Sequence, residues 1–321
     1  MLLRATIAFS LAVSAPAAAE WRAETVTAPG RATAVDVENG IVRIEIGAKW
    51  YRLAKDAPTL ARTEPPARPA LPPDALPDGR VAIGTAQVAR AWLAAPTNRY
   101  GHAVLGDAIE AGSVVIERRD GRRGRVTLGR DAVFEDLFPR IASIGGRDWI
   151  VVVKSYLDRG SALAVIDTDS MTIAAETPPI GRAHAWLNPA GIADFDGNGT
   201  TDIALVRQPH VVGRLELWSW NDRKLIKTAE VVDVSNHFIG SRALGLSWTE
   251  DFDGDGHPDL AVPSLDRRTL RIIGFAPEVR DIARVRLPAR MATDIGATMF
   301  NGKLALIAGL EDGRLILIRD Q

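Results

Sequence analysis

Pairs of short apolar segments recur along this chain about every fifty residues, and this repeat constrains the fold more than any other feature. The first members of five pairs begin at His102, Trp149, Ile203, Leu260 and Leu304. The second member begins 10 to 13 residues later, and consecutive pairs begin 47, 54, 57 and 44 residues apart. The segments are short, rich in β-branched residues and bounded by Gly, Asp and Pro, which predicts strands rather than helices.

Most pairs are flanked by a further candidate strand on each side, such as PRIASI before the second pair and MTIAAE after it. Four strands per unit at this period are typical of a β-propeller blade. We therefore predict an all-β fold, a β-propeller of five or six four-stranded blades within residues 80–321. A β-sandwich with coincidental spacing is the alternative.

The N-terminal part of the chain is predicted to close the ring. The last unit stops after LILIRDQ and lacks a fourth strand, whereas residues 20–56 contain the strand candidates IVRIEI and KWYRL. Because open sheet edges favour aggregation, we expect a strand from residues 20–56 to complete the last blade. Residues 57–79 are crowded with proline, which predicts an extended connector. Residues 20–56 plus RVAIGTAQ are alternatively a sixth blade.

Residues 1–19 have the pattern of a secretory signal peptide. Arg4 precedes an apolar run that is too short to span a bilayer, and Ala17-Ala18-Ala19 offers a cleavage site. The chain has no cysteine, which excludes a lipoprotein signal and disulfides. We expect a periplasmic or secreted protein without a membrane span. A formal charge of −1 gives no general attraction for nucleic acid or anionic membranes.

Two acidic stretches, DFDGNGTTDIALV from Asp194 and DFDGDGHPDLAV from Asp251, precede apolar strands. Oxygen ligands at alternating positions can wrap one cation, and glycine at the sixth position allows the sharp turn. The predicted ligands are Asp194, Asp196, Asn198, Thr200 and Asp202 in loop one (residues 194–202), and Asp251, Asp253, Asp255, His257 and Asp259 in loop two (residues 251–259). The seventh residues, Thr200 and His257, would contribute backbone carbonyls.

An EF-hand is excluded because the twelfth position is Leu205 or Val262 instead of glutamate, and because strands flank the loops. The pattern D-x-D-x-[DN]-G-x-x-D before an apolar strand resembles the FG-GAP/VCBS repeats of integrin-α-like β-propellers. Phe195 and Phe252 inside the loops also resemble that family. The resemblance implies two calcium sites. The other three units lack the loop.

We expect each calcium ion to be structural, because clustered carboxylates repel one another and the ion would tie two strands of a blade. Magnesium is less suited to an irregular cage of protein oxygens. A solvated Asp-Gly turn is the alternative for each loop.

Outside the loops, the sequence shows no catalytic constellation. The five histidines lack metal-binding spacing and are interpreted as structural. The arginine-rich stretch ERRDGRRGR (117–125) is interpreted as a solvated hairpin tip, with an acidic partner as the alternative. Trp218 and Trp220 face one side of a strand and are expected to pack between blades.

The leading functional hypothesis is an exported, calcium-stabilised β-propeller that binds a protein or a glycan without catalysis. Two alternatives remain, because one fold hosts many functions. One is an enzyme acting on polysaccharide or phosphoester at the propeller mouth. The other is an accessory subunit of an envelope complex.

Overall fold

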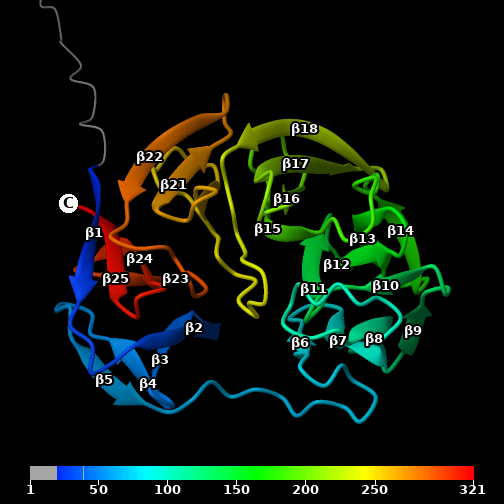
Figure 1. Cartoon of the computed structure of the whole chain (residues 1–321). Helices are drawn as coiled ribbons and strands as arrows, with labels where there is room; N and C mark the ends of the chain where they lie inside the picture. Colours follow the sequence, from blue (N-terminus) through cyan, green and yellow to red (C-terminus); the bar gives the residue numbers. More distant parts are fainter. Residues whose placement is uncertain (1–19, 39) are drawn as a thin grey trace, which may run out of the picture.

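The structure is a computed structural model that describes residues 20–38 and 40–321. Every regular element in these residues is a β-strand, and the strands form four four-stranded sheets and one nine-stranded sheet. Figure 1 shows the sheets arranged as blades around a ring. The predicted all-β propeller is therefore confirmed. Within the described residues, no helix is long and apolar enough to cross a membrane. The predicted signal peptide lies outside these residues.

Two blades in the C-terminal half follow the predicted repeat. Their strands are β15 (Leu187–Ala193), β16 (Asp202–Arg207), β17 (Arg214–Asn221) and β18 (Lys224–Val232) in one blade, and β19 (Trp248–Glu250), β20 (Asp259–Pro263), β21 (Thr269–Gly274) and β22 (Arg280–Arg286) in the next. Strands that follow one another in sequence pair with one another, as short connections favour. Figure 1 shows β18 and β22 at the outer rim.

The nine-stranded sheet consists of two four-stranded groups joined by one short strand. Its strands are β6 (Ala82–Ile83), β7 (Val88–Thr97), β8 (Glu110–Arg118) and β9 (Arg123–Thr127), the joining strand β10 (Ala132–Phe134), and β11 (Arg140–Ile144), β12 (Arg147–Tyr156), β13 (Gly160–Asp167) and β14 (Thr172–Glu176). β10 pairs with both β8 and β12, so it bridges neighbouring blades.

One strand of the first unit was predicted in the wrong place. Residues 102–105 (HAVL) form no strand, and β7 is instead the partner of β8. Val104 and Leu105 lie on the connection between β7 and β8 and are buried in a hydrophobic cluster with Trp186 and Leu244. The run is therefore apolar because it fills space between blades, not because it lies in a sheet.

The last blade is closed by the N-terminal strand, as the sequence predicts. Its strands are β1 (Trp21–Val26), β25 (Leu315–Asp320), β24 (Lys303–Gly309) and β23 (Gly296–Phe300), in spatial order. β1 pairs antiparallel with β25, with Trp21 opposite Asp320 and Val26 opposite Leu315. This pairing covers an edge that would otherwise be open.

The strand candidates IVRIEI and KWYRL do not supply the closing strand. They form a separate sheet of β2 (Ala32–Glu38), β3 (Ile41–Ile46), β4 (Lys49–Leu53) and β5 (Leu60–Thr63). β5 comes from the first residues of the predicted connector. The remaining connector runs from this sheet to the nine-stranded sheet (Figure 1).

The hydrophobic core lies between neighbouring blades. Trp220 on β17 packs against Trp149 on β12 with ring centroids 4.8 Å apart, and Trp218 packs against the same cluster. The expected packing of both tryptophans between blades is therefore confirmed.

The two ends of the strands carry different groups of loops. Loop one enters β16 at Asp202, whereas the connection 208–213 leaves β16 after Arg207. Loop one and the corresponding loop two therefore lie at one end of the strands. The connections 98–109, 177–186, 208–213 and 233–247 lie at the other end, which we call the histidine face.

Candidate metal loops and the histidine face

Both acidic loops connect the first and second strands of a blade. Loop one joins β15 to β16, and loop two joins β19 to β20, so Asp202 and Asp259 are the first residues of buried strands. Gly199 and Gly256 have φ of +83° and +88°, a backbone conformation that favours glycine. The loops therefore turn sharply at the position that the sequence indicates.

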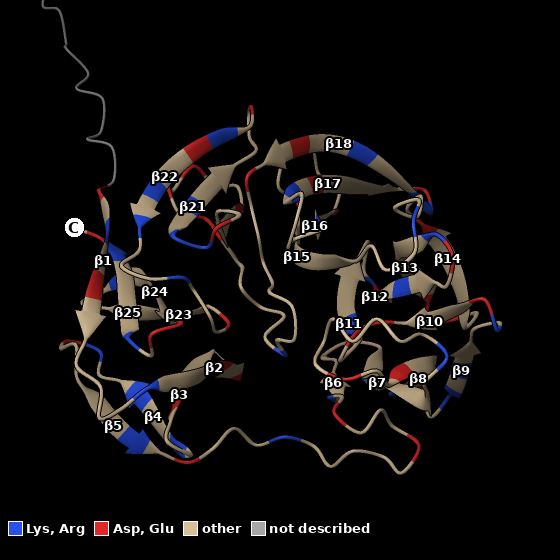
Figure 2. Ribbon diagram, viewed as in Figure 1, with Lys and Arg blue, Asp and Glu red and all other residues tan. Residues whose placement is uncertain are grey.

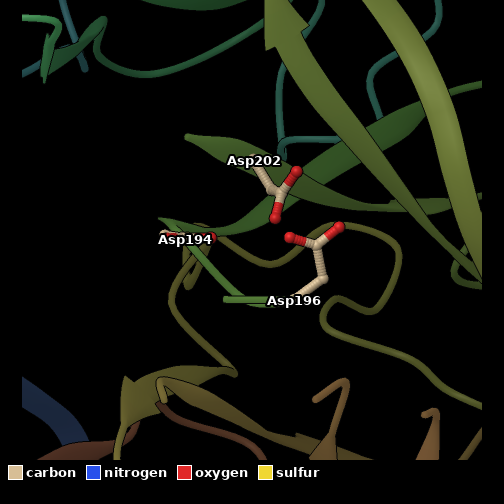
Figure 3. Close-up of side chains that lie close together, drawn as sticks. All are labelled: Asp194, Asp196 and Asp202. Atoms are coloured by element: carbon tan, nitrogen blue, oxygen red, sulfur yellow. The ribbon is translucent and has the colours of Figure 1, made fainter. Parts of the chain in front are cut away.

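Three aspartates converge in each loop. Carboxylate oxygens of Asp194, Asp196 and Asp202 lie within 4.8 Å of one another, and those of Asp251, Asp253 and Asp259 do the same. Figure 3 shows the carboxylates of Asp196 and Asp202 facing each other. The first, third and ninth positions of each loop are thus brought together, as a single bound cation would require.

The predicted ligands at the fifth position lie differently in the two loops. The Asn198 amide donates to Asp196 Oδ2 at 2.8 Å, so it sits within the cluster of loop one. The Asp255 carboxylate is not part of the converging group of loop two, and it pairs with Arg280 on β22 at 3.1 Å.

The predicted seventh-position residues close the turn through their backbone. The N–H groups of Thr200 and His257 donate to Asn198 Oδ1 and Asp255 Oδ1 at 2.8 and 2.9 Å. The His257 imidazole lies against loop one, since a Cβ built on Gly197 would stand 2.4 Å from its Cε1. His257 therefore brings the two loops into contact, a role that the sequence did not indicate.

Loop one contains negative charge without a counter-ion. Burial and the nearby Asp196 charge raise the pKa of Asp202, although Ser219 Oγ donates to this carboxylate. Asp194 Oδ2 accepts from Gly199 N at 2.9 Å, but its buried Oδ1 has no hydrogen-bond partner among the described residues. No Lys or Arg of the described chain pairs with the three aspartates of loop one. A buried, unpartnered carboxylate oxygen is costly, and a cation would satisfy it.

Loop two has an internal counter-ion. Arg280 Nη2 lies 2.7 Å from Asp253 Oδ2 and 3.1 Å from Asp255 Oδ2. Burial, and then the charges of the three other loop aspartates, raise the pKa of Asp259 to about 7. The oxygen donors of both loops suit a hard cation such as Ca²⁺, and loop two holds a guanidinium as a partial substitute.

The histidine face gathers four of the five histidines, which the sequence analysis treated as separate. They lie on four different connections, at His102, His184, His210 and His237. The His102 and His184 rings stack with centroids 5.1 Å apart and an interplanar angle of 8°. Because lone pairs lie in the ring plane, two parallel stacked rings cannot direct them to one ion. The His102–His184 pair therefore does not resemble a metal site.

A buried carboxylate supports one side of this face. His102 Nδ1 lies 2.6 Å from Glu135 Oε1, and the hydroxyls of Ser155 and Ser161 donate to Glu135 Oε2. Glu135 is fully buried, whereas the His102 side chain is 18% exposed. In a neutral His102 ring that donates Nδ1–H to Glu135, Nε2 is left as a hydrogen-bond acceptor.

A second titratable group lies nearby. Burial, followed by the charges of Glu135 and Asp107, raises the pKa of Glu110 to about 10. Burial also raises the pKa of Tyr100, whose hydroxyl accepts from His184 N at 3.0 Å. The sequence could not indicate this grouping, because Glu135 and His184 reach it from other parts of the chain.

The arginine-rich stretch has partners within the chain. Arg118 and Arg122 pair with Asp120 and Asp169. The other three arginines, Arg119, Arg123 and Arg125, contact the Gly84 carbonyl, Glu117 and Asp74. Figure 2 likewise shows basic and acidic segments mixed along the outer strands. These pairings favour the interpretation of a solvated hairpin tip.

Comparison with known proteins identified no family. No protein-family model matches the chain, and no curated protein matches it either. Similar solved structures include BamB from Moraxella catarrhalis, with 11% identity over 89% of this chain and 71% of that chain, and a TM-score of 0.40. The Cps50 (Swd1) β-propeller domain from Myceliophteria thermophila has 11% identity over 92% and 98% of the chains, and a TM-score of 0.46. Rhamnogalacturonan lyase YesW has 14% identity over 93% and 68%, and a TM-score of 0.45. We draw no function from similarities at this level.

Proposed function

We propose that this protein is an exported β-propeller, stabilised by two calcium ions, that binds a protein or glycan partner through its histidine face. The observation that carries the proposal is that the two ends of the strands carry different features. One end holds the converging aspartates, and the other holds a cavity and exposed apolar side chains.

The calcium part of the proposal rests on loop one. Asp194, Asp196 and Asp202 converge, and a buried Asp194 oxygen lacks a partner among the described residues. Bound calcium would neutralise this charge and join two strands of the blade, so its role would be structural. The expected affinity is weak, with Kd on the order of 0.1–1 mM, as in other extracellular modules.

The binding part of the proposal rests on exposed apolar side chains. Val211 and Ile239 are 67% and 69% exposed, and both lie on connections of the histidine face. Ile109 and Val212 on the same face are also exposed. Large apolar side chains grouped on one face mark interaction surfaces more often than scattered ones do.

Thermal unfolding with chelator and with millimolar calcium tests the metal proposal. We expect calcium to raise the melting temperature of the wild type, and to have no effect on a variant carrying Asp196→Ala and Asp253→Ala. If calcium does not change the melting temperature of the wild type, both loops are ordinary turns that do not bind calcium.

A binding screen tests the second part separately. The immobilised protein, saturated with calcium, would be exposed to envelope extract and to a glycan panel. Capture that is lost on Val211→Glu plus Ile239→Glu supports the proposed surface. Capture of nothing, or capture unchanged in this variant, contradicts it.

One observation favours an enzyme as a second candidate function. In its neutral form, His102 presents an imidazole acceptor backed by the buried Glu135 carboxylate, the arrangement of a general base. Turnover of polysaccharide or phosphoester substrates that disappears in His102→Gln, with an unchanged melting temperature, would favour the enzyme. No turnover of either substrate class by the wild type would eliminate it.

A further inference from the structure

A small cavity on the histidine face has chemistry that selects its ligand. Its volume is about 280 Å³, near the lower end of ligand pockets. The lining includes His210, Phe238, Ile239, Leu265 and Arg267, which lie on three connections of two neighbouring blades. We propose that this cavity binds an acidic sugar unit, with Arg267 receiving the carboxylate and His210 accepting a hydrogen bond from a hydroxyl group. The inference rests on the proposed binding function and names the ligand class.

The hydrogen-bond chain fixes which nitrogen of His210 is free. His237 Nε2 lies 2.9 Å from the Ser241 carbonyl oxygen, which can only accept, so Nε2 of His237 carries the proton. Burial lowers the pKa of His237 to about 3, so the ring is neutral and its Nδ1 must accept. His210 Nε2, 2.8 Å from this Nδ1, is therefore the donor.

Nδ1 of His210 is consequently an acceptor without a proton. Burial, then the charges of His102 and Arg267, lower the pKa of His210 to about 4, so this ring is also neutral at pH 7. Trp186 stacks on the ring with an interplanar angle of 12° and restricts its orientation. The ligand must therefore present an O–H or N–H donor to His210.

Arg267 supplies the positive charge. Its guanidinium donates to the Met291 carbonyl and stacks over Phe238 at 4.4 Å, and it forms no ion pair with a carboxylate of the described residues. Partial burial lowers its pKa, because the guanidinium gives up part of its hydration. An anion entering the cavity would offset this cost.

The other charged groups of the cavity, Asp266 and Arg290, carry opposite charges. Asp266 Oδ1 accepts from Ser264 Oγ at 2.6 Å and from Arg268 N at 2.9 Å. Arg290 pairs loosely with Glu311 at 3.7 Å. Phe238, Ile239 and Leu265 provide the apolar surface that the C–H face of a sugar ring requires. A hydroxyl donor, an anion and an apolar face together describe a uronic acid rather than a neutral sugar.

Titration calorimetry of the calcium-saturated full chain with glucuronate, galacturonate and glucose tests the proposal. We expect at least one uronate to bind at least tenfold more tightly than glucose, and Arg267→Gln to weaken that binding at least tenfold. Arg267→Lys, which retains charge without the planar fork, should fall between. Arg268→Gln, next in the chain and outside the cavity, is the matched control and should bind like the wild type.

Two further results separate the possible sources of the ligand. Tighter binding of an oligouronide than of the single sugar assigns the cavity to an acidic polysaccharide, and equal binding assigns it to a free sugar acid. Binding of an aspartate-rich peptide in place of uronates, or equal binding of glucose and uronates, overturns the proposal. So does Arg267→Gln binding like the wild type.

Imidazole nitrogen NMR provides a readout that does not depend on folding of a variant. At pH 7 we expect both His210 and His237 as neutral rings protonated at Nε2, and the added uronate to shift the Nδ1 signal of His210. A His210 ring protonated at Nδ1 contradicts the assignment. Because the acidic loops lie at the other end of the strands, loss of calcium dependence and loss of uronate binding are separate outcomes.

Discussion

Replacing Arg280 by alanine should make the protein less stable without calcium and more responsive to it. Arg280 pairs with Asp253 and Asp255 in loop two, at 2.7 and 3.1 Å. If calcium binds in this loop, the guanidinium and the ion compete for the same carboxylates. Removing Arg280 would leave the loop without any counter-charge until calcium arrives.

The size of the effect follows from the exposure of the pairs. The three side chains are between 23% and 33% exposed, so solvent screens them in part. Two such pairs contribute about 0.5–2 kcal/mol together. In chelator, Arg280→Ala should therefore lower the melting temperature by about 1–6 °C. In the variant, calcium does not have to displace a guanidinium from Asp253 and Asp255. The Kd of loop two for calcium should therefore fall about 2- to 30-fold.

Thermal melts of wild type and variant, in chelator and across a calcium titration, measure both effects. The two melting temperatures should differ in chelator and converge in saturating calcium. Arg284→Ala is the matched control, since Arg284 lies on the same strand and pairs with Asp281 away from the loop. If the melting temperature of Arg280→Ala lies as far below that of the wild type in saturating calcium as in chelator, then calcium and Arg280 do not compete for these carboxylates.

Three other predictions concern the loops, the buried acid and ring closure. Gly197→Ala should lose about 1–3 kcal/mol more stability than Gly199→Ala in chemical denaturation, because only the former places a Cβ against His257; equal losses would contradict this contact. The pKa of Glu110 is raised to about 10, so its stabilisation is full below about pH 4.5 and is lost as pH rises toward 10. Wild-type stability should thus fall by up to about 1.4 kcal/mol per pH unit between pH 7 and 9, and Glu110→Gln should flatten this slope; parallel slopes would refute the assignment. Deleting β1 should abolish cooperative unfolding, measured by calorimetry, unless a peptide of its sequence is added; an intact transition without the peptide would contradict ring closure by this strand.

The fold could be predicted because the same burial of central strands recurs in every blade. Each blade buries its central strands on both sides, so short apolar runs must recur. The pattern misled where a buried apolar run does not form a strand. Residues 102–105 are apolar because they fill a gap between blades. Leu244 and Leu246 are likewise buried in the core on the connection that precedes β19.

The acidic loops could be found in the sequence because all their converging carboxylates lie within nine consecutive residues. The residues that reach the loops from other parts of the chain could not be found in this way. Arg280 reaches loop two from β22, and His257 packs on Gly197 of the other loop. The histidine face is likewise invisible in the sequence, because closure of the ring, not local spacing, brings its four connections together.

The pairing of β1 with β25 has a consequence for how the chain matures. During synthesis, β1 is available long before the strand that it must meet. At about 5–20 residues per second, it waits roughly 15–60 s for that partner. Throughout this interval β1 has no partner strand, because β23, β24 and β25 are the last strands to be synthesised. Closure of the ring therefore cannot precede the end of synthesis, whichever blades fold earlier. The pairing of β1 with β25 is the last strand pairing of the ring to form.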